Sequence, residues 1–192
     1  MTNLFPEVGG WLFDHEFLAL QRLATDKKVL EIGCYQGRST VAMATTAEHV
    51  FTIDSFEGDD FTESTVGGGI SKEVCKDAFL RNTKQFDNVS LLEFDMYDML
   101  ENLLPSNFDF IFYDAGHSAD DTKFFLDWVQ SAPDDTIIAL HDYKPDGEPK
   151  WHESAVVMMD FHRRTGRKFI VIGSLLILYN GTLDFEEKDF TP

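Results

Sequence analysis

Two pairs of ionisable residues close neighbouring apolar runs late in the sequence. Asp114 ends the run FDFIFYD and His117 lies three residues after it, whereas His141 and Asp142 complete the run TIIALHD. Carboxylate and imidazole groups that meet in this way can take a proton from a hydroxyl group, or hold a divalent cation that lowers the pKa of that hydroxyl. The alternative is structural: His141 bonds to a strand end and Asp142 pairs with Lys144.

The elements that carry these four groups decide whether they meet. Short runs rich in Val, Ile and Phe alternate with amphipathic segments, which is typical of parallel βαβ units with helices on both faces of a sheet. Because parallel strands share one carboxyl edge, neighbouring strand ends open onto the same crevice. The sequence predicts strands at 27–33, 49–55, 88–94, 108–114, 136–142, 168–173 and 175–180, and helices at 38–47, 72–84, 96–103, 119–131 and 151–164.

The last two predicted strands are joined only by Gly173 and Ser174. A connection this short cannot make a crossover, so these strands should be antiparallel. We therefore expect a Rossmann-like α/β fold in three layers, with a seven-stranded, mostly parallel sheet whose last strand is antiparallel.

The stretch VLEIGCYQGRST ends the first predicted strand and turns into a helix. Gly33 would let a ligand approach the backbone, and Gly37 would allow the tight turn. A phosphate-binding loop needs Lys and then Ser or Thr after its last glycine, whereas Arg38 and Ser39 stand here at a different spacing. A dinucleotide-binding loop needs a third glycine, and Glu31 would sit badly against a pyrophosphate.

The order of elements and the acid-x-Gly loop resemble the class I S-adenosylmethionine-dependent methyltransferases, whose sheet also has an antiparallel seventh strand. The cofactor of that family carries an ammonium and a sulfonium but no phosphate, which suits Glu31. Tyr35 replaces the family's middle glycine, a variant that looks like the small-molecule O-methyltransferases acting on sugars and related hydroxyl compounds. The resemblance covers roughly residues 10–180.

Two further acids suit a nucleoside ligand. Asp54 ends the second strand near the spacing of about 20 residues after the glycine loop that is expected for a ribose-binding carboxylate. The resemblance implies that Asp95 accepts the adenine amino group, with Met96 packed on the adenine face, although Asp95 also suits a helix N-cap. The expected cofactor-binding residues are Glu31, Gly33, Tyr35, Gly37, Ser39, Asp54, Ser55, Asp95, Met96 and Asp114.

The resemblance also implies roles at the fourth and fifth strand ends. In metal-dependent relatives, such as catechol O-methyltransferase and the macrolide-sugar O-methyltransferases, acids or amides at these positions hold magnesium. Carried over by position, the metal ligands are Asp114, Asp142 and His141, and a histidine ligand suits Mn²⁺ better than Mg²⁺. His117 matches the base of the sugar-modifying branch, so the expected catalytic residues are His117 and Asp114.

The composition narrows the class of partner. Sixteen basic and 34 acidic residues give a formal net charge of -18, which opposes binding to nucleic acid and to anionic membranes. The longest apolar stretch, 169–179, is too short to span a bilayer, and MTNLFPEVGG has no signal-peptide pattern. We expect a cytoplasmic protein with a small-molecule substrate, and the sequence leaves open whether it forms a homo-oligomer.

The chain length suits one domain over residues 1–192, with an N-terminal helical segment (1–25), a glycine-rich lid loop (55–72) and an acidic tail (181–192). Alternatives to methyl transfer are a module that binds S-adenosylmethionine or S-adenosylhomocysteine without catalysis, and a nicotinamide-dependent oxidoreductase. The missing third glycine and the terminal hairpin argue against the oxidoreductase.

Overall fold

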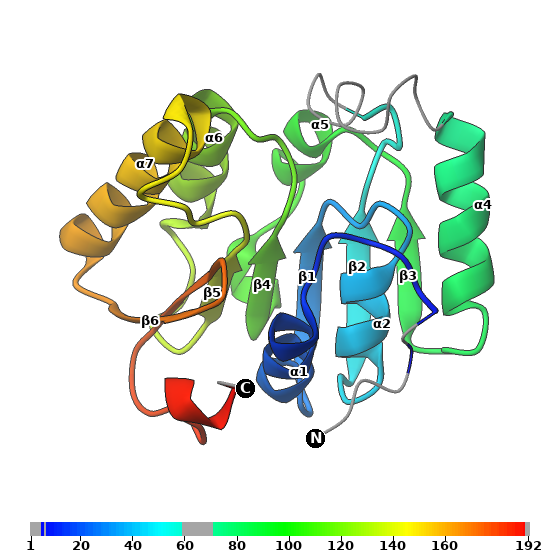
Figure 1. Ribbon diagram of the computed structural model, residues 1–192, viewed down its shortest axis with the longest axis horizontal. Helices are drawn as coiled ribbons and strands as arrows, with labels where there is room; N and C mark the ends of the chain where they lie inside the picture. The colour runs from blue at the N-terminus through cyan, green and yellow to red at the C-terminus, as the bar shows by residue number, and fades with distance from the viewer. Residues whose placement is uncertain (1–4, 6, 59–70, 191–192) are drawn as a thin grey trace.

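A seven-stranded mixed sheet forms the middle layer of the computed structural model, which describes residues 5, 7–58 and 71–190 (Figure 1). The strands are β1 (Lys28–Ile32), β2 (His49–Ile53), β3 (Val89–Leu92), β4 (Phe110–Tyr113), β5 (Ile137–Leu140), β6 (Lys168–Ile172) and β7 (Leu175–Tyr179). Their order is β3-β2-β1-β4-β5-β7-β6, and β7 runs antiparallel to both of its neighbours. The remaining pairs are parallel, so the predicted Rossmann-like fold is confirmed.

Helices cover both faces of the sheet. They are α1 (Asp14–Leu23), α2 (Arg38–Ala44), α4 (Lys72–Thr83), α5 (Met96–Leu100), α6 (Ala119–Val129) and α7 (Pro149–Thr165), with 3-10 turns η1 (Pro105–Asn107) and η2 (Glu187–Asp189). Residues of α1 and α2 pack on one face, and residues of α5, α6 and α7 pack on the other. None of the helices in this described part of the chain is long and apolar enough to cross a bilayer.

Successive residues of the central strands alternate between these two cores. Val29 and Phe112 pack with α1 and α2, whereas Leu30 and Ile111 pack with α5, α6 and α7. This alternation follows from the pleat, which turns successive side chains to opposite faces. Whether a strand residue packs against α1 and α2 or against α5, α6 and α7 therefore depends on whether its position along the strand is odd or even.

An irregular N-terminal strap, residues 7–13, precedes α1 and crosses the start of α2. The Arg38 guanidinium holds it by donating hydrogen bonds to the carbonyl oxygens of Val8 (2.7 Å) and Leu12 (2.7 Å) and to the Asp14 carboxylate (2.8 Å). Among the described residues of the predicted helical segment at 1–25, the helix thus begins at Asp14.

Two other predicted segments have different outcomes. Residues 59–70 of the predicted lid lie outside the described residues, and Ser71 caps α4 by accepting the backbone N–H of Val74 (3.4 Å). The acidic stretch at the C-terminus was expected to be a tail, but Phe185 and Phe190 are buried in the α1 core and face each other edge-on.

The loop between β1 and α2 contains the two glycines singled out above. Gly37 is the N-cap of α2 and makes the predicted turn. Gly33 has a φ of +84°, and a Cβ there would lie 2.2 Å from the carbonyl oxygen of Asp114. The need for glycine at position 33 therefore comes from the neighbouring strand end, rather than from the ligand approach expected from the sequence.

The Glu31 carboxylate joins β1 to α2 from inside the protein. Its side chain is fully buried and accepts hydrogen bonds from the hydroxyls of Ser39 (2.5 Å) and Thr40 (2.5 Å). Burial raises the pKa of Glu31 to about 7, although these hydroxyls act in the opposite direction. A protonated Glu31 is thus compatible with the fold near neutral pH.

Replacing Gly33 by Ala should destabilise the fold strongly. The new Cβ collides with backbone that cannot rotate away, and the positive φ adds strain, so we expect a loss of about 3 to 4 kcal/mol. Gly166→Ala is the matched control, because Gly166 also has a positive φ (+67°) but nothing within 4 Å of an added Cβ. It should cost about 1 kcal/mol. Equal losses for both variants in urea unfolding would contradict the steric argument.

Replacing Glu31 by Gln should change how stability depends on pH. The folded state raises the pKa of Glu31 from 4.5 to about 7. The stability that this group contributes therefore falls as the pH rises from 4.5 through 7, while the amide of the variant does not titrate. The free energy of unfolding of the variant relative to wild type should therefore increase by up to about 3 kcal/mol between pH 4.5 and 7.5. Urea unfolding at both pH values measures this, and a difference that stays constant would contradict the raised pKa.

Candidate functional site

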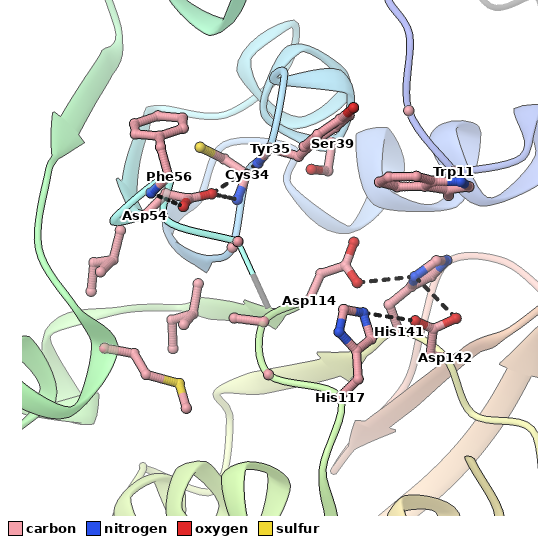
Figure 2. A pocket seen from close by; sticks show the side chains of 18 of the residues that line it. Trp11, Cys34, Tyr35, Ser39, Asp54, Phe56, Asp114, His117, His141 and Asp142 are labelled. Atoms are coloured by element: carbon pink, nitrogen blue, oxygen red, sulfur yellow. Dashed lines mark hydrogen bonds and ion pairs between the residues drawn. The ribbon is translucent and has the colours of Figure 1, made fainter. Parts of the chain in front are cut away.

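A cleft of about 500 Å³ opens at the carboxyl ends of the central strands. Its walls come from the ends of β1, β2, β4 and β5, the loop after β1, the start of α5 and the N-terminal strap. Figure 2 shows Asp54, Asp114, His117 and Asp142 around this cleft, with Trp11 beside them. The predicted site residues that line it are Gly33, Tyr35, Ser39, Asp54, Ser55, Asp95, Met96, Asp114, His117, His141 and Asp142.

Glu31 and Gly37 are the two predicted site residues that are not among the lining residues. The Glu31 carboxylate was expected to face a charged ligand, but it lies behind the wall and is occupied by Ser39 and Thr40. Glu31 therefore holds the start of α2, where Ser39 and Thr40 lie, instead of contacting the cleft directly. Ser39 lines the cleft, but its hydroxyl is directed to Glu31.

Asp54 organises one end of the cleft. Its Oδ2 accepts the backbone N–H groups of Cys34 (2.8 Å) and Tyr35 (2.9 Å), and its Oδ1 accepts that of Phe56 (2.7 Å). These bonds hold the loop after β1, in which Tyr35 has a φ of +48°. Because an ionised carboxylate has about four acceptor positions, Asp54 retains capacity for a hydroxyl group of a ligand.

Asp95 and Met96 continue the same end of the cleft. Asp95 is the N-cap of α5 and accepts the backbone N–H of Tyr97 (2.8 Å), so the capping alternative is confirmed. Met96 is nearly buried and contributes to the wall. The Tyr97 hydroxyl donates to Asp121 (2.5 Å), and this bond is the main reason that the pKa of Tyr97 rises to about 12.

The ionisable side chains that follow β4 and β5 lie together at the other end of the cleft. One ligand atom each from Asp114, His117 and Asp142 lies within 4.8 Å of the others. His117 Nε2 lies 3.4 Å from Asp142 Oδ2, and the Lys144 ammonium pairs with Asp142 Oδ1, as the structural alternative proposed. Burial would raise the pKa of Asp142, but His117, His141 and Lys144 together lower it. Asp142 also has a φ of +58°, the kind of backbone strain that is retained at functional sites.

His141 is oriented differently from the expectation that it binds a metal. Its Nδ1 lies 3.1 Å from Asp114 Oδ1, and its Nε2 lies 3.1 Å from the Ser174 hydroxyl and 3.4 Å from Glu16 Oε2. Burial disfavours the charged imidazole, yet Asp114, Glu16 and Asp142 raise the pKa of His141 well above its ordinary value. Both ring nitrogens are thus committed, and His117 takes the place beside the two carboxylates.

Glu16 belongs to none of the motifs described for the sequence, yet it is fully buried behind His141. Burial would raise the pKa of Glu16, but His141 and the backbone N–H groups of Ser174 and Phe13 outweigh it and lower that pKa. The sequence DHEFLAL, which contains Glu16, indicates the start of a helix. It does not indicate the contact of Glu16 with His141, which lies 125 positions further along the chain.

Comparison with known proteins identifies a family to which the sequence is similar. Residues 30–143, more than half of the chain, match the family model described as a methyltransferase domain. No curated protein matches the sequence.

Several solved structures share the fold at low sequence identity. An O-methyltransferase from Bacillus cereus, solved with SAH, has a TM-score of 0.60 and 14% identity, over 91% of this chain and 85% of that one. The O-methyltransferase TomG from Streptomyces achromogenes, solved with SAM, has a TM-score of 0.59 and 17% identity, over 92% and 83%.

CalS11, a TDP-rhamnose 3'-O-methyltransferase of calicheamicin biosynthesis, has a TM-score of 0.56 and 15% identity, over 89% of this chain and 82% of that one. These likenesses agree with the seven-stranded sheet, and the match to the family model covers the strands whose ends form the cleft. The chain therefore belongs to the methyltransferase domain family, with an O-methyltransferase-like class I fold.

Proposed function

We propose that this protein transfers a methyl group from S-adenosylmethionine to a hydroxyl group of a small molecule, such as a sugar. The observation that carries the proposal is one cleft with two chemically different ends. A loop-holding carboxylate (Asp54) lies at one end, and a group of ionisable side chains (Asp114, His117 and Asp142) lies at the other. The O-methyltransferase relatives support this reading, and CalS11 supports a sugar acceptor.

The Asp54 end suits the nucleoside part of the cofactor. Asp54 would accept a ribose hydroxyl, Asp95 would accept the adenine amino group, and Met96 would pack on the adenine face. Of the Arg and Lys side chains that line the cleft, Arg38 donates to the N-terminal strap and to Asp14, and Lys144 pairs with Asp142. Such a wall suits a ligand without phosphate better than a dinucleotide.

His117 is the proposed base for the acceptor hydroxyl. When bound, S-adenosylmethionine supplies the electrophilic methyl group, and the protein must orient and deprotonate the acceptor. His117 faces the cleft, and Asp142 lies 3.4 Å behind its Nε2. A carboxylate in this position orients the imidazole and stabilises the protonated form that arises when the hydroxyl gives up its proton. Asp114 would then help to hold the acceptor.

A second candidate route uses a divalent cation, which the grouping of Asp114, His117 and Asp142 favours. Two carboxylates and an imidazole suit Mn²⁺ better than Mg²⁺. In the present arrangement, however, each carboxylate already faces a donor, since Asp114 contacts His141 and Asp142 contacts Lys144. A cation would have to displace these contacts, so we place the base route first.

The ribose role predicts that Asp54→Ala weakens binding of S-adenosylhomocysteine. Loss of a charged acceptor, together with release of the loop it holds, should reduce affinity by about 10- to 100-fold. Isothermal titration calorimetry measures this, with circular dichroism as a check on folding. Asp87→Ala is the control, because Asp87 is an exposed acid before β3 at the opposite edge of the sheet. Unchanged affinity in Asp54→Ala would refute the role.

The base route predicts that turnover survives a chelator. In a panel of sugar and phenol acceptors, methyl transfer should persist with EDTA, while His117→Gln should lower kcat by about 100-fold without changing affinity for S-adenosylhomocysteine.

Loss of turnover with EDTA, restored by Mn²⁺ more effectively than by Mg²⁺, would instead assign His117, Asp114 and Asp142 as metal ligands. If S-adenosylhomocysteine binds but no acceptor in the panel is methylated, a module that binds the cofactor without catalysis would be favoured.

A further inference from the structure

Glu16 is a buried acid that neither the sequence motifs nor the proposed chemistry explains. It lies in the first turn of α1 and is 0% exposed. Its Oε1 accepts the backbone N–H (2.6 Å) and the hydroxyl (2.8 Å) of Ser174, and its Oε2 accepts the backbone N–H of Phe13 (2.8 Å). A carboxylate without water requires several donors of this kind, so the pocket around Glu16 is built for a charged group.

His141 connects this buried carboxylate to the cleft. Its Nε2 faces Glu16 Oε2 at 3.4 Å, and its Nδ1 faces Asp114 Oδ1 at 3.1 Å. The His141 side chain is 5% exposed, whereas that of Asp114 is 28% exposed. The three side chains therefore form a row from the interior to the cleft, and Figure 2 shows its outer part, from His141 to Asp114.

The turn between β6 and β7 fits closely around Glu16. A Cβ at Gly173 would lie 2.5 Å from Glu16 Oε1, so a larger residue at position 173 would displace the carboxylate. Gly173 thus lets the turn approach until the N–H of Ser174 reaches Glu16. The row of side chains is supported by α1, by the β6–β7 turn and by the ends of β5 and β4.

We propose that Glu16 is a positioning residue that holds Asp114, through His141, in the orientation required at the reaction centre. The same carboxylate holds the N–H of Phe13, which ends the strap carrying Trp11 along the cleft. Glu16 therefore sets the relative position of the strap and the strand-end group. The inference rests on the proposed function, because it gives Asp114 a place at the site of methyl transfer.

Glu16→Gln tests the proposal with little change in shape. The amide oxygen can still accept both Ser174 donors, but the amide nitrogen cannot accept from Phe13 or His141. We expect His141 to lose its anchor and Asp114 to leave its position. By analogy with residues that orient metal ligands, kcat should fall about 10- to 100-fold. Affinity for S-adenosylhomocysteine should stay within about 2-fold of wild type, because Asp54 and Asp95 are untouched.

A double-mutant cycle separates positioning from a general loss of stability. If Glu16 acts through Asp114, Glu16→Gln should lower kcat much less in an Asp114→Asn background than in wild type. Glu48→Gln is the control for loss of an acid, since Glu48 is exposed at the opposite edge of the sheet. Equal effects of Glu16→Gln in both backgrounds would overturn the proposal.

A crystal structure of Glu16→Gln with S-adenosylhomocysteine provides a readout that needs no acceptor. The proposal requires the 3.1 Å contact between His141 Nδ1 and Asp114 Oδ1 to be lost or disordered, and unmoved side chains would overturn it. Failure of the proposed function would appear in the wild type itself, as absent binding or turnover. Should Glu16→Gln not fold, Ser174→Ala removes one donor from the same carboxylate and should lower kcat by about 3-fold through a smaller shift of His141.

Discussion

The parallel pairing of β4 with β1 on one side and β5 on the other is the constraint on which the site depends. Tyr113 pairs with Ile32 and with Leu140, so the three strands end level with one another. Asp114 and His141 are the first residues after β4 and β5, so their side chains meet just beyond the edge of the sheet. Gly33, next after β1, packs against the Asp114 carbonyl so closely that no side chain fits between them. A shift of one residue in either pairing would turn every side chain beyond it to the opposite face.

Much of the fold and part of the site follow from local patterns. Strand lengths, helix order and the Gly173-Ser174 connection were sufficient to predict the sheet, because they depend on residues close together in sequence. The position of Glu31 was also accessible in principle: Val29 and Glu31 share a parity, and Val29 packs against the α1 and α2 side. The acid-x-Gly motif points instead to a ligand contact for this acid. The alternation along a strand predicts which face of the sheet a residue points to. A motif predicts only which part of the fold the residue lies in.

The remainder of the site depends on contacts that no local pattern contains. Glu16 bonds to Ser174 across 158 positions and faces His141 across 125. The strap lies in place because Arg38 reaches the carbonyl of Val8, although a helix was predicted for this region. His141 contacts Glu16 instead of standing free as a metal ligand for the same reason, since this acid comes from a distant helix. The sequence thus shows which ionisable side chains the site contains, but it does not show which partner each of them contacts.

The late position of the β6–β7 turn has a consequence for the newly made protein. During synthesis, the glycine loop, Asp54 and the ends of β4 and β5 leave the ribosome well before residue 174. Until that turn arrives, Glu16 lacks both Ser174 donors, and β7 cannot enter the sheet between β5 and β6. A nascent chain therefore carries nearly all the groups of the cleft while their interior support is still missing. Chains that end before residue 174 therefore contain all three side chains of the row from Glu16 to Asp114 but lack the Ser174 donors that hold Glu16 in place.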